Sequence, residues 1–332
     1  MNKQLLLKAL ETVKPALANR ENFEQATSFA FIGNKVITYN DEISISQEVE
    51  GLDLTGAVSA KELYQLLGKL KQEEIDLIAT ENELLIKGGK VKAGISFNSK
   101  VKLPIESIDK IGKWKLLPED FTEALEIAVN CCSNDLSRLI LTCVHVNGNI
   151  IEASDSVKLY KHTLKKEVQT NKFLLPANSA KELIKMRVTH IAEGKGAWIH
   201  FKSENAMISC RILEENYPDS EKYFKKIDGA QFTFPKGLNN TLDKITIFSD
   251  LVKIDCDNKI MTISSFNDGG NSIGWVKERF KSLHKGEPIT FGINVNLLKL
   301  ILNKNQTCLI NKDFLLFTGD NWKYLACLYL IS

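Results

Sequence analysis

The chain has 332 residues, a hydrophobic fraction of 44% and a charged fraction of 25%, values typical of a soluble globular protein with two or three domains. Its net charge of +2 is low for a protein that wraps nucleic acid, although a basic face is compatible with it. We find no signal-peptide core, no apolar run of about 18 residues and no CxxC pair among the seven cysteines, so we expect a cytoplasmic protein with reduced cysteines.

The first predicted helix covers residues 3–14, where Leu6, Leu10 and Val13 share one face. A second helix is predicted at 59–70, with its leucines again at helical spacing. Alternating apolar residues and turn signals predict short strands around these helices, at 28–33, 35–40, 75–80, 83–88 and 90–97.

This order of elements recurs along the chain. The pentapeptide Ser59–Leu63 (SAKEL) returns unchanged as Ser179–Leu183, and a degenerate third copy lies at Asn294–Leu298. Each copy is predicted to open a helix and to be preceded by an earlier helix, at 119–130 and 236–247 in the later units. We therefore predict three repeats, with domains at 1–114, 115–227 and 228–332.

The repeats predict an α+β fold in which two helices cover one face of antiparallel sheets in each domain. Three such domains joined end to end leave one free sheet edge at each end. Head-to-tail pairing of these edges between two copies would close a ring.

At this point the sequence resembles the bacterial DNA sliding clamps, the beta subunits of DNA polymerase III, as a divergent or phage-encoded member. The resemblance covers essentially the whole chain and is strongest in the middle repeat. It rests on the segments Arg138–Leu141 (RLIL), Ala153–Leu159 (ASDSVKL), Phe173–Pro176 (FLLP), Ser209–Asp219 (SCRILEENYPD) and Ile289–Leu298 (ITFGINVNLL). It implies a sliding clamp fold and a ring that encircles double-stranded DNA without reading its sequence.

Basic residues recur on the polar faces of the predicted helices, where either solvent or the phosphate backbone would suit them. The resemblance implies that Arg20, just after the first helix, contacts DNA. The candidate DNA-binding residues are therefore Lys8, Lys14, Arg20, Lys61, Lys69, Lys181, Lys185, Lys244 and Lys299. Where the family has a basic pair after Pro176, this chain has Ala177 and Asn178, so contact there should be weaker.

The resemblance also implies an apolar pocket that binds a short linear peptide of the DNA polymerase and other DNA-processing partners. Its residues would be Leu141, Ser154, Ser156, Val157, Lys158, Leu159, Pro218, Lys222, Tyr223, Ala326, Cys327, Leu328, Tyr329 and Leu330. The family's Gly-His-Arg is Ser156–Lys158 here, so the pocket is expected to prefer a different peptide. Leu141 and Leu159 are also compatible with ordinary core positions.

The resemblance places Ala93, Ile95, Ile247 and Phe248 at the interface of a head-to-tail homodimer, although Phe248 also suits a core. We expect no enzyme, no cofactor and no metal, because no P-loop or HExxH spacing is present. An ATP-dependent clamp loader would open the ring, and no membrane contact is expected. Two alternatives stay open, namely a clamp-like interaction scaffold that does not encircle DNA, and an α+β enzyme that shares only the repeat.

Overall fold

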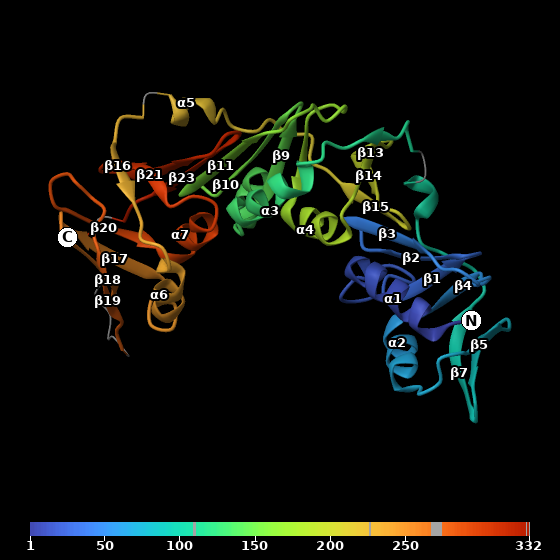
Figure 1. Cartoon of the computed structure of the whole chain (residues 1–332). Helices are drawn as coiled ribbons and strands as arrows, with labels where there is room; N and C mark the ends of the chain where they lie inside the picture. Colours follow the sequence, from blue (N-terminus) through green and yellow to red (C-terminus); the bar gives the residue numbers. More distant parts are fainter. Residues whose placement is uncertain (109–110, 226, 267–273, 330, 332) are drawn as a thin grey trace. The chain divides into compact units, whose positions relative to one another are not determined.

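The computed structural model describes residues 1–108, 111–225, 227–266, 274–329 and 331 (Figure 1). The chain divides into two compact units, each described by itself below. Unit 1 contains Met1–Glu123 and Lys166–Glu215, and unit 2 contains Ala124–Lys165 and Asn216–Ser332. The three domain boundaries drawn from the sequence do not coincide with this division and stay a prediction.

Unit 1 is an antiparallel sheet with its α-helices on one face, and the segment that contains residues 105–107 packs on the opposite face (Figure 1). Its sheet runs in the order β5-β6-β7-β4-β1-β2-β3-β15-β14-β13-β8. The helices of the unit are α1 (Lys3–Val13), η1 (Lys14–Ala16), α2 (Ala60–Lys69), η2 (Ile105–Ser107) and α4 (Ala177–Met186). The strands are β1 (Ser28–Ile32), β2 (Lys35–Tyr39), β3 (Ile43–Glu48), β4 (Gly56–Ser59), β5 (Asp76–Ala79), β6 (Glu83–Gly88), β7 (Val91–Asn98), β8 (Lys115–Leu116), β12 (Phe173–Pro176), β13 (His190–Glu193), β14 (Trp198–Lys202) and β15 (Ala206–Arg211).

Unit 2 contains two antiparallel sheets. One includes the order β9-β10-β11-β23-β22-β21-β16, and the other is β19-β18-β17-β20. Its helices are η3 (Leu136–Thr142), α5 (Glu221–Phe224), α6 (Leu238–Ile245) and α7 (Val295–Leu302), and α3 (Phe121–Cys131) enters it from unit 1. The strands are β9 (Cys143–Asn147), β10 (Ile150–Ser154), β11 (Lys158–Thr163), β16 (Ala230–Thr233), β17 (Leu251–Cys256), β18 (Ile260–Phe266), β19 (Lys277–Lys281), β20 (Ile289–Asn294), β21 (Thr307–Ile310), β22 (Phe314–Thr318) and β23 (Trp322–Cys327).

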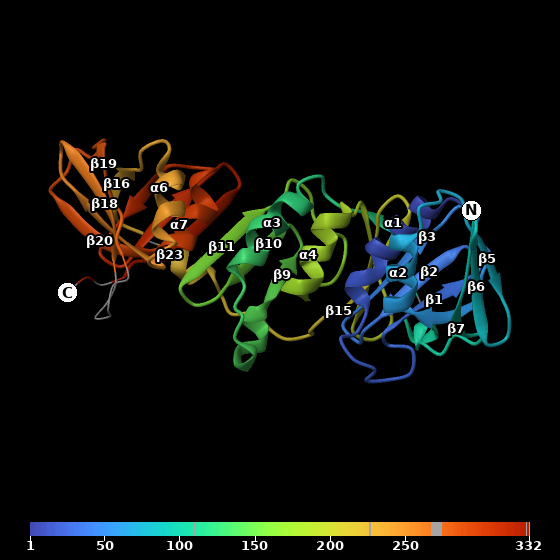
Figure 2. The ribbon, with the colours of Figure 1, turned by 90° about the horizontal axis from the view of Figure 1, so that it is seen from below.

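The helices pack in pairs against the sheets, as the α+β prediction requires. In unit 1, α1 and α2 lie side by side over the strands, and in unit 2 α6 and α7 do the same (Figure 2). The apolar stripe of α1 faces the core, because Leu6, Leu10 and Val13 are completely buried. The α+β class and the antiparallel sheets predicted from the sequence are confirmed. None of the described helices has the length and apolar character needed to cross a membrane.

The SAKEL copies do not occupy the same place in their helices. Ser59 is the N-cap residue of α2, and Asn294 holds the same position before α7, where its side chain accepts a hydrogen bond from the Asn296 N–H. However, α4 begins at Ala177, directly after the extended Pro176, so Ser179 lies inside its first turn. The expectation that each copy opens a helix is therefore wrong for the second copy. Both copies still bury their leucine completely.

Each repeat contains a third strand that we did not predict, namely β3, β11 and β19. Two of these strands join one repeat to the next through what we call a seam. In the first seam β3 pairs with β15, and in the second β11 pairs with β23. Both seams are antiparallel, and each connects the third strand of one repeat to the last strand of the following one.

Candidate functional site

An open pocket of about 230 Å³ lies on unit 2. It is formed by the turn between β10 and β11, the segment that follows β15, and the end of β23. Its lining residues are Leu141, Ser154, Ser156, Val157, Lys158, Leu159, Tyr217, Pro218, Asp219, Ser220, Tyr223, Leu325 and Cys327.

Asp155 shapes the turn at the mouth of this pocket. One carboxylate oxygen accepts hydrogen bonds from the Val157 and Lys158 N–H groups, at 3.0 and 2.9 Å. The other lies 2.8 Å from Lys158 Nζ in a pair that is mostly shielded from solvent. The lysine that lines the pocket is therefore neutralised within the turn, and its aliphatic stem is left to form the wall.

Ser156 lies at the tip of this turn with φ of +83°, a left-handed conformation that favours glycine. Its hydroxyl accepts a hydrogen bond from Arg138 Nη1 at 2.9 Å. The resemblance described above would place glycine here, and Ser156 has a backbone conformation that glycine adopts easily. The bond to Arg138 offsets part of the cost of a side chain at this position.

A buried polar cluster supports the opposite wall. His145 Nδ1 lies 2.8 Å from Glu152 Oε1, and Ser220 Oγ donates to the other carboxylate oxygen. The Tyr217 ring stacks on His145 with a centroid distance of 4.8 Å. Burial, followed by the nearby Glu152 carboxylate, raises the pKa of Tyr217 well above its usual range, so the phenol stays neutral. These contacts fix the segment that carries Pro218.

The pocket has an apolar floor and an exposed apolar rim. Leu159 and Leu325 are buried in one hydrophobic cluster with Leu316. Val157 and Tyr223 at the rim are 50% and 55% exposed. A floor of buried leucines beneath exposed apolar side chains can accept the anchors of an apolar peptide.

The predicted pocket residues fall into two groups. Leu141, Ser154, Ser156, Val157, Lys158, Leu159, Pro218, Tyr223 and Cys327 line the pocket. The others do not: Lys222 lies over the Tyr223 ring, Ala326 is completely buried, Tyr329 bridges Gly292, and Leu328 donates to the Asp313 carbonyl. Leu330 lies outside the described residues.

We missed four lining residues, Tyr217, Asp219, Ser220 and Leu325. The signal for Leu325 was available, because side chains of a strand alternate between faces. Cys327 and Leu325 therefore share a face, whereas Ala326 and Leu328 belong to the other one.

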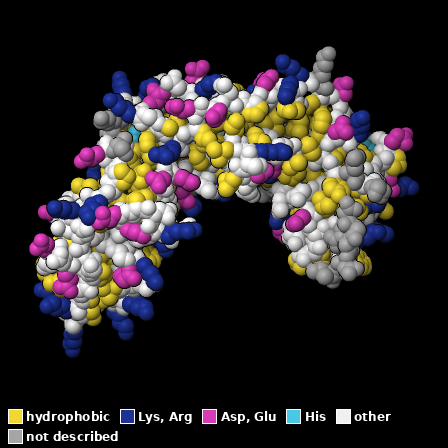
Figure 3. Space-filling model, turned by 180° about the vertical axis from the view of Figure 1, so that it is seen from behind, with side chains coloured by type: hydrophobic (Ala, Val, Ile, Leu, Met, Phe, Trp, Pro, Cys, Tyr) yellow, Lys and Arg dark blue, Asp and Glu magenta, His cyan; other side chains and the backbone are white. Residues whose placement is uncertain are grey.

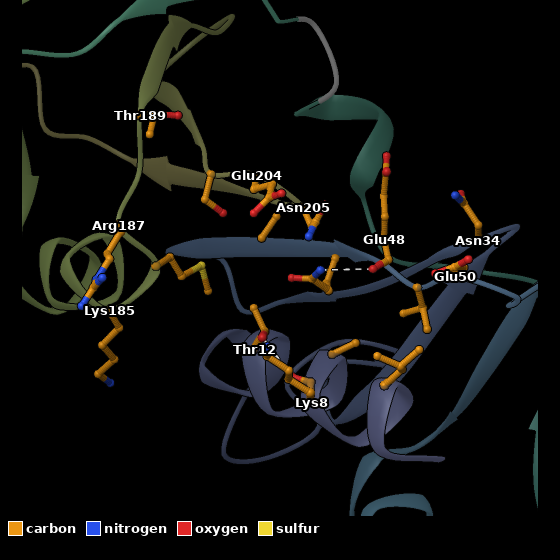
Figure 4. A pocket seen from close by; sticks show the side chains of 17 residues that line it. Lys8, Thr12, Asn34, Glu48, Glu50, Lys185, Arg187, Thr189, Glu204 and Asn205 are labelled. Carbon is orange, nitrogen blue, oxygen red and sulfur yellow. Dashed lines mark hydrogen bonds between the residues drawn. The ribbon is translucent and has the colours of Figure 1, made fainter. Parts of the chain in front are cut away.

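A larger hollow of about 920 Å³ lies on unit 1, between α1, the end of α4 and the turn between β14 and β15 (Figure 4). Two predicted DNA-binding residues, Lys8 and Lys185, line it together. Arg187, which we missed, lines it beside Lys185, and Glu48, Glu50 and Glu204 also take part. The hollow is therefore mixed in charge.

The remaining basic candidates are all on or just after helices, and several have partners. Arg20, Lys61, Lys69 and Lys181 are exposed, and no ion pair is recorded for them among the described residues. Lys185 is paired with Glu182 at 2.7 Å, Lys244 with Glu278 at 3.2 Å, and Lys299 with Asp243. Lys14 lies 4.7 Å from the centre of the Tyr64 ring. On the face seen in Figure 3, lysine and arginine side chains are interspersed with acidic ones.

The predicted interface residues lie on two different units. Ala93 and Ile95 are half-buried on β7 of unit 1. Ile247 is 68% exposed just after α6 of unit 2, and the ring of the half-buried Phe248 packs against Gly274. Within the described residues, no group of three or more His, Cys, Asp or Glu side chains could hold a metal ion.

Comparison with known proteins gives a result at the level of structure. No protein-family model and no curated protein sequence matches this chain. Among solved structures, the beta chain of DNA polymerase III from Streptococcus pneumoniae matches with a TM-score of 0.83 and 19% identity, over 99% of this chain and 98% of that one. The beta sliding clamp of C. crescentus matches with a TM-score of 0.83 and 14% identity, over 100% and 98%. The Pseudomonas aeruginosa sliding clamp, solved with griselimycin bound, matches with 0.81 and 16%, over 100% and 98%.

These likenesses extend over the whole of both chains. The polypeptide therefore has the fold of bacterial DNA polymerase III beta subunits, with a divergent sequence. The fold that the sequence resemblance implied is confirmed.

Proposed function

We propose that this protein is a sliding clamp, in which two copies close head to tail into a ring around double-stranded DNA. The observation that carries the proposal is the pair of seams. Two third strands, β3 and β11, pair with last strands, β15 and β23. Within the described residues, β19 pairs with β18 and with no last strand. The edge of β7 that faces away from β6 is paired only at one end, where it meets β4. A second copy would supply both missing pairings at once.

A ring retains DNA by its topology, so it needs only weak and unspecific contact with phosphate groups. The exposed Arg20, Lys61 and Lys181 suit such contact because they carry charge without reading base edges. Lys185, Lys244 and Lys299 are partly neutralised by their acidic partners and would contribute less. Such a protein has no reaction to catalyse, and an ATP-driven loader would have to open it.

The pocket on unit 2 would tether the polymerase and other DNA-processing proteins through a short linear peptide. Its apolar floor supports this role, since buried anchors supply most of the affinity in such complexes. Because Lys158 is neutralised by Asp155, we expect the pocket to select apolar anchors more strongly than acidic ones. Selection of a random peptide library on the protein should enrich adjacent apolar residues, and Val157→Glu should abolish the enrichment.

DNA retention without a loader provides the main test. A ring can thread onto a linear duplex that is fixed at one end, and blocking the free end afterwards should make its retention resistant to salt. We expect salt-resistant retention only when the free end is blocked after the protein has been added. Replacement of Arg20 and Lys61 by Glu should reduce it, whereas Lys312→Glu, in the turn between β21 and β22, should not.

Two outcomes would contradict the proposal. A protein that stays monomeric at micromolar concentration cannot close the ring. A dimer that is released equally from blocked and open duplexes would point to the interaction scaffold instead.

A further inference from the structure

The three repeats can be aligned residue by residue from their own strand pairing. In each repeat, the residue three positions before the second helix bridges the last strand, in the pairs Ala57–Asn98, Leu174–Leu213 and Gly292–Tyr329. Counting back four residues along the last strands places Gly94, Ser209 and Leu325 at equivalent positions.

The third strands can be aligned in the same way. In the first repeat, Ala57 pairs with Ala30, Ala30 with Ile37, and Ile37 with Ser46 of the third strand. In the third repeat, Gly292 pairs with Lys253, Lys253 with Ser264, and Ser264 with Lys277 of the third strand. Ser46 and Lys277 are therefore equivalent. Two residues earlier, Ser44 corresponds to Trp275. In the first two repeats, Gly33 and Gly148 lie in the turn between the first and second strands, so these glycines are equivalent. Counting from each glycine along the second strand and across its pairs with the third strand makes Leu159 equivalent to Ser44.

Both seams use these equivalent positions as direct partners. Ser44 pairs with Ser209 in the first seam, and Leu159 pairs with Leu325 in the second. We infer that, in the proposed ring on which this inference rests, Trp275, two residues before β19, lies directly opposite Gly94 of the partner subunit and covers it. The same register places Val276 opposite the partner's Ala93.

The direction of the backbone groups supports this register. The Phe97 N–H donates to the Asn82 carbonyl on the β6 side, so Gly94 turns its polar groups away from β6. The Ser265 N–H donates to the Val276 carbonyl, so Trp275 turns its polar groups away from β18. The two outward-turned residues are the ones that the repeat alignment brings together. A slip of one residue would bring an outward-turned residue against an inward-turned one.

The side chains also fit this register. Trp275 is 74% exposed, which leaves a large aromatic surface without cover. Gly94 has no side chain of its own, and the flexible end of the Glu83 side chain lies where its Cβ would be. The ring would displace that end and lie against the backbone. The first seam places two serines opposite each other, and the second places two leucines opposite each other. The proposed junction between subunits would place a large side chain opposite a residue that has none. Gly274, against which the Phe248 ring packs, would face the partner's Ile95.

Engineered disulfides test the register. Val276 and the partner's Ala93 would form a pair without mutual hydrogen bonds, where Cα atoms are about 4.5 Å apart and a disulfide can form. We expect Ala93→Cys combined with Val276→Cys to yield a covalent dimer on oxidation. Neither single variant should do so, and six of the seven native cysteines are buried. A matched pair, Ala93→Cys with Glu278→Cys, reports a register shifted by two residues.

The outcomes separate the register from the ring itself. Cross-linking of the first pair alone supports the inference. Cross-linking of the shifted pair overturns the register and leaves the ring standing. A native protein that sediments as a monomer at micromolar concentration would contradict both the register and the ring.

Substitution of the aromatic ring provides a second measurement. We expect Trp275→Ala to raise the dimer dissociation constant at least about tenfold and Trp275→Phe to raise it less. In this register Lys277 faces the partner's Lys92, so Lys92→Glu should lower the dissociation constant by roughly two- to fivefold. A dissociation constant within about twofold of the native value for Trp275→Ala would overturn the inference.

Discussion

His200 should make the stability of this protein fall in mild acid. The residue lies on β14 and is completely buried, and its Nδ1 lies 2.9 Å from Ser209 Oγ. Its Nε2 is buried without a hydrogen-bond partner among the described atoms. The protonated ring would need an acceptor for a second N–H, and the described part of the chain offers none to Nε2. Burial accordingly lowers the pKa of His200 from 6.5 to about 4.

The sign and size of the effect follow from proton linkage. Between the two pKa values the unfolded chain binds the proton and the folded chain does not, so the free energy of unfolding falls as the pH falls. For a group that titrates at about 4 when folded and at 6.5 when unfolded, the loss between pH 7 and pH 5 is about 2 kcal/mol. The loss would be complete only below the folded pKa.

Urea unfolding at both pH values, for the native protein and for His200→Gln, measures this contribution. Glutamine stays neutral throughout, so the variant should lose about 2 kcal/mol less than the native protein on acidification. Its absolute stability will be lower, because a well-packed ring is lost, but only the difference between the two pH values bears on the prediction. Equal losses for both proteins would show that His200 is not buried in its neutral form.

Three further predictions concern backbone strain and the pocket turn. Arg187 ends α4 with φ of +49°, so Arg187→Gly should raise the free energy of unfolding by about 0.5–1 kcal/mol, whereas Lys181→Gly in the middle of the same helix should lower it by about 1 kcal/mol. Ser156→Gly should change stability by less than about 1 kcal/mol, because relief of the left-handed strain offsets the lost bond to Arg138, and a larger loss would contradict the strain argument. Asp155→Ala should cost about 2–3 kcal/mol and Asp155→Asn about half as much, because the amide oxygen can keep the turn while losing the pair with Lys158; urea midpoints measure both, and equal costs would show that the charge alone matters.

The repeat could be read from the sequence because helices leave a strong periodic signal. The stripe of Leu6, Leu10 and Val13 located α1 to within a residue of its observed end. The third strands were missed for two different reasons. The alternation in Ile43–Glu48 was visible and was overlooked, whereas Lys277–Lys281 is too highly charged to suggest a strand. A strand of the second kind can be found only from its pairing.

The pocket was only partly predictable, because its residues come from segments far apart in the chain. Leu159 illustrates the limit, since the alternatives of core residue and pocket residue both hold: it is buried in a cluster and also forms the floor. Arg187 gave no signal, because a left-handed helix end is usually marked by glycine or asparagine. Ion pairs such as Lys299 with Asp243 likewise depend on the packing of two helices.

The two lysines that the proposed register brings together, Lys92 and Lys277, have a consequence for the salt dependence of the ring. Added salt screens the repulsion between like charges, so it should tighten the junction between the two copies. The same salt weakens contact between lysine side chains and the phosphate backbone, because the release of counterions into a more concentrated salt solution is less favourable. The ring would therefore close most firmly at salt concentrations where it slides most freely along its duplex.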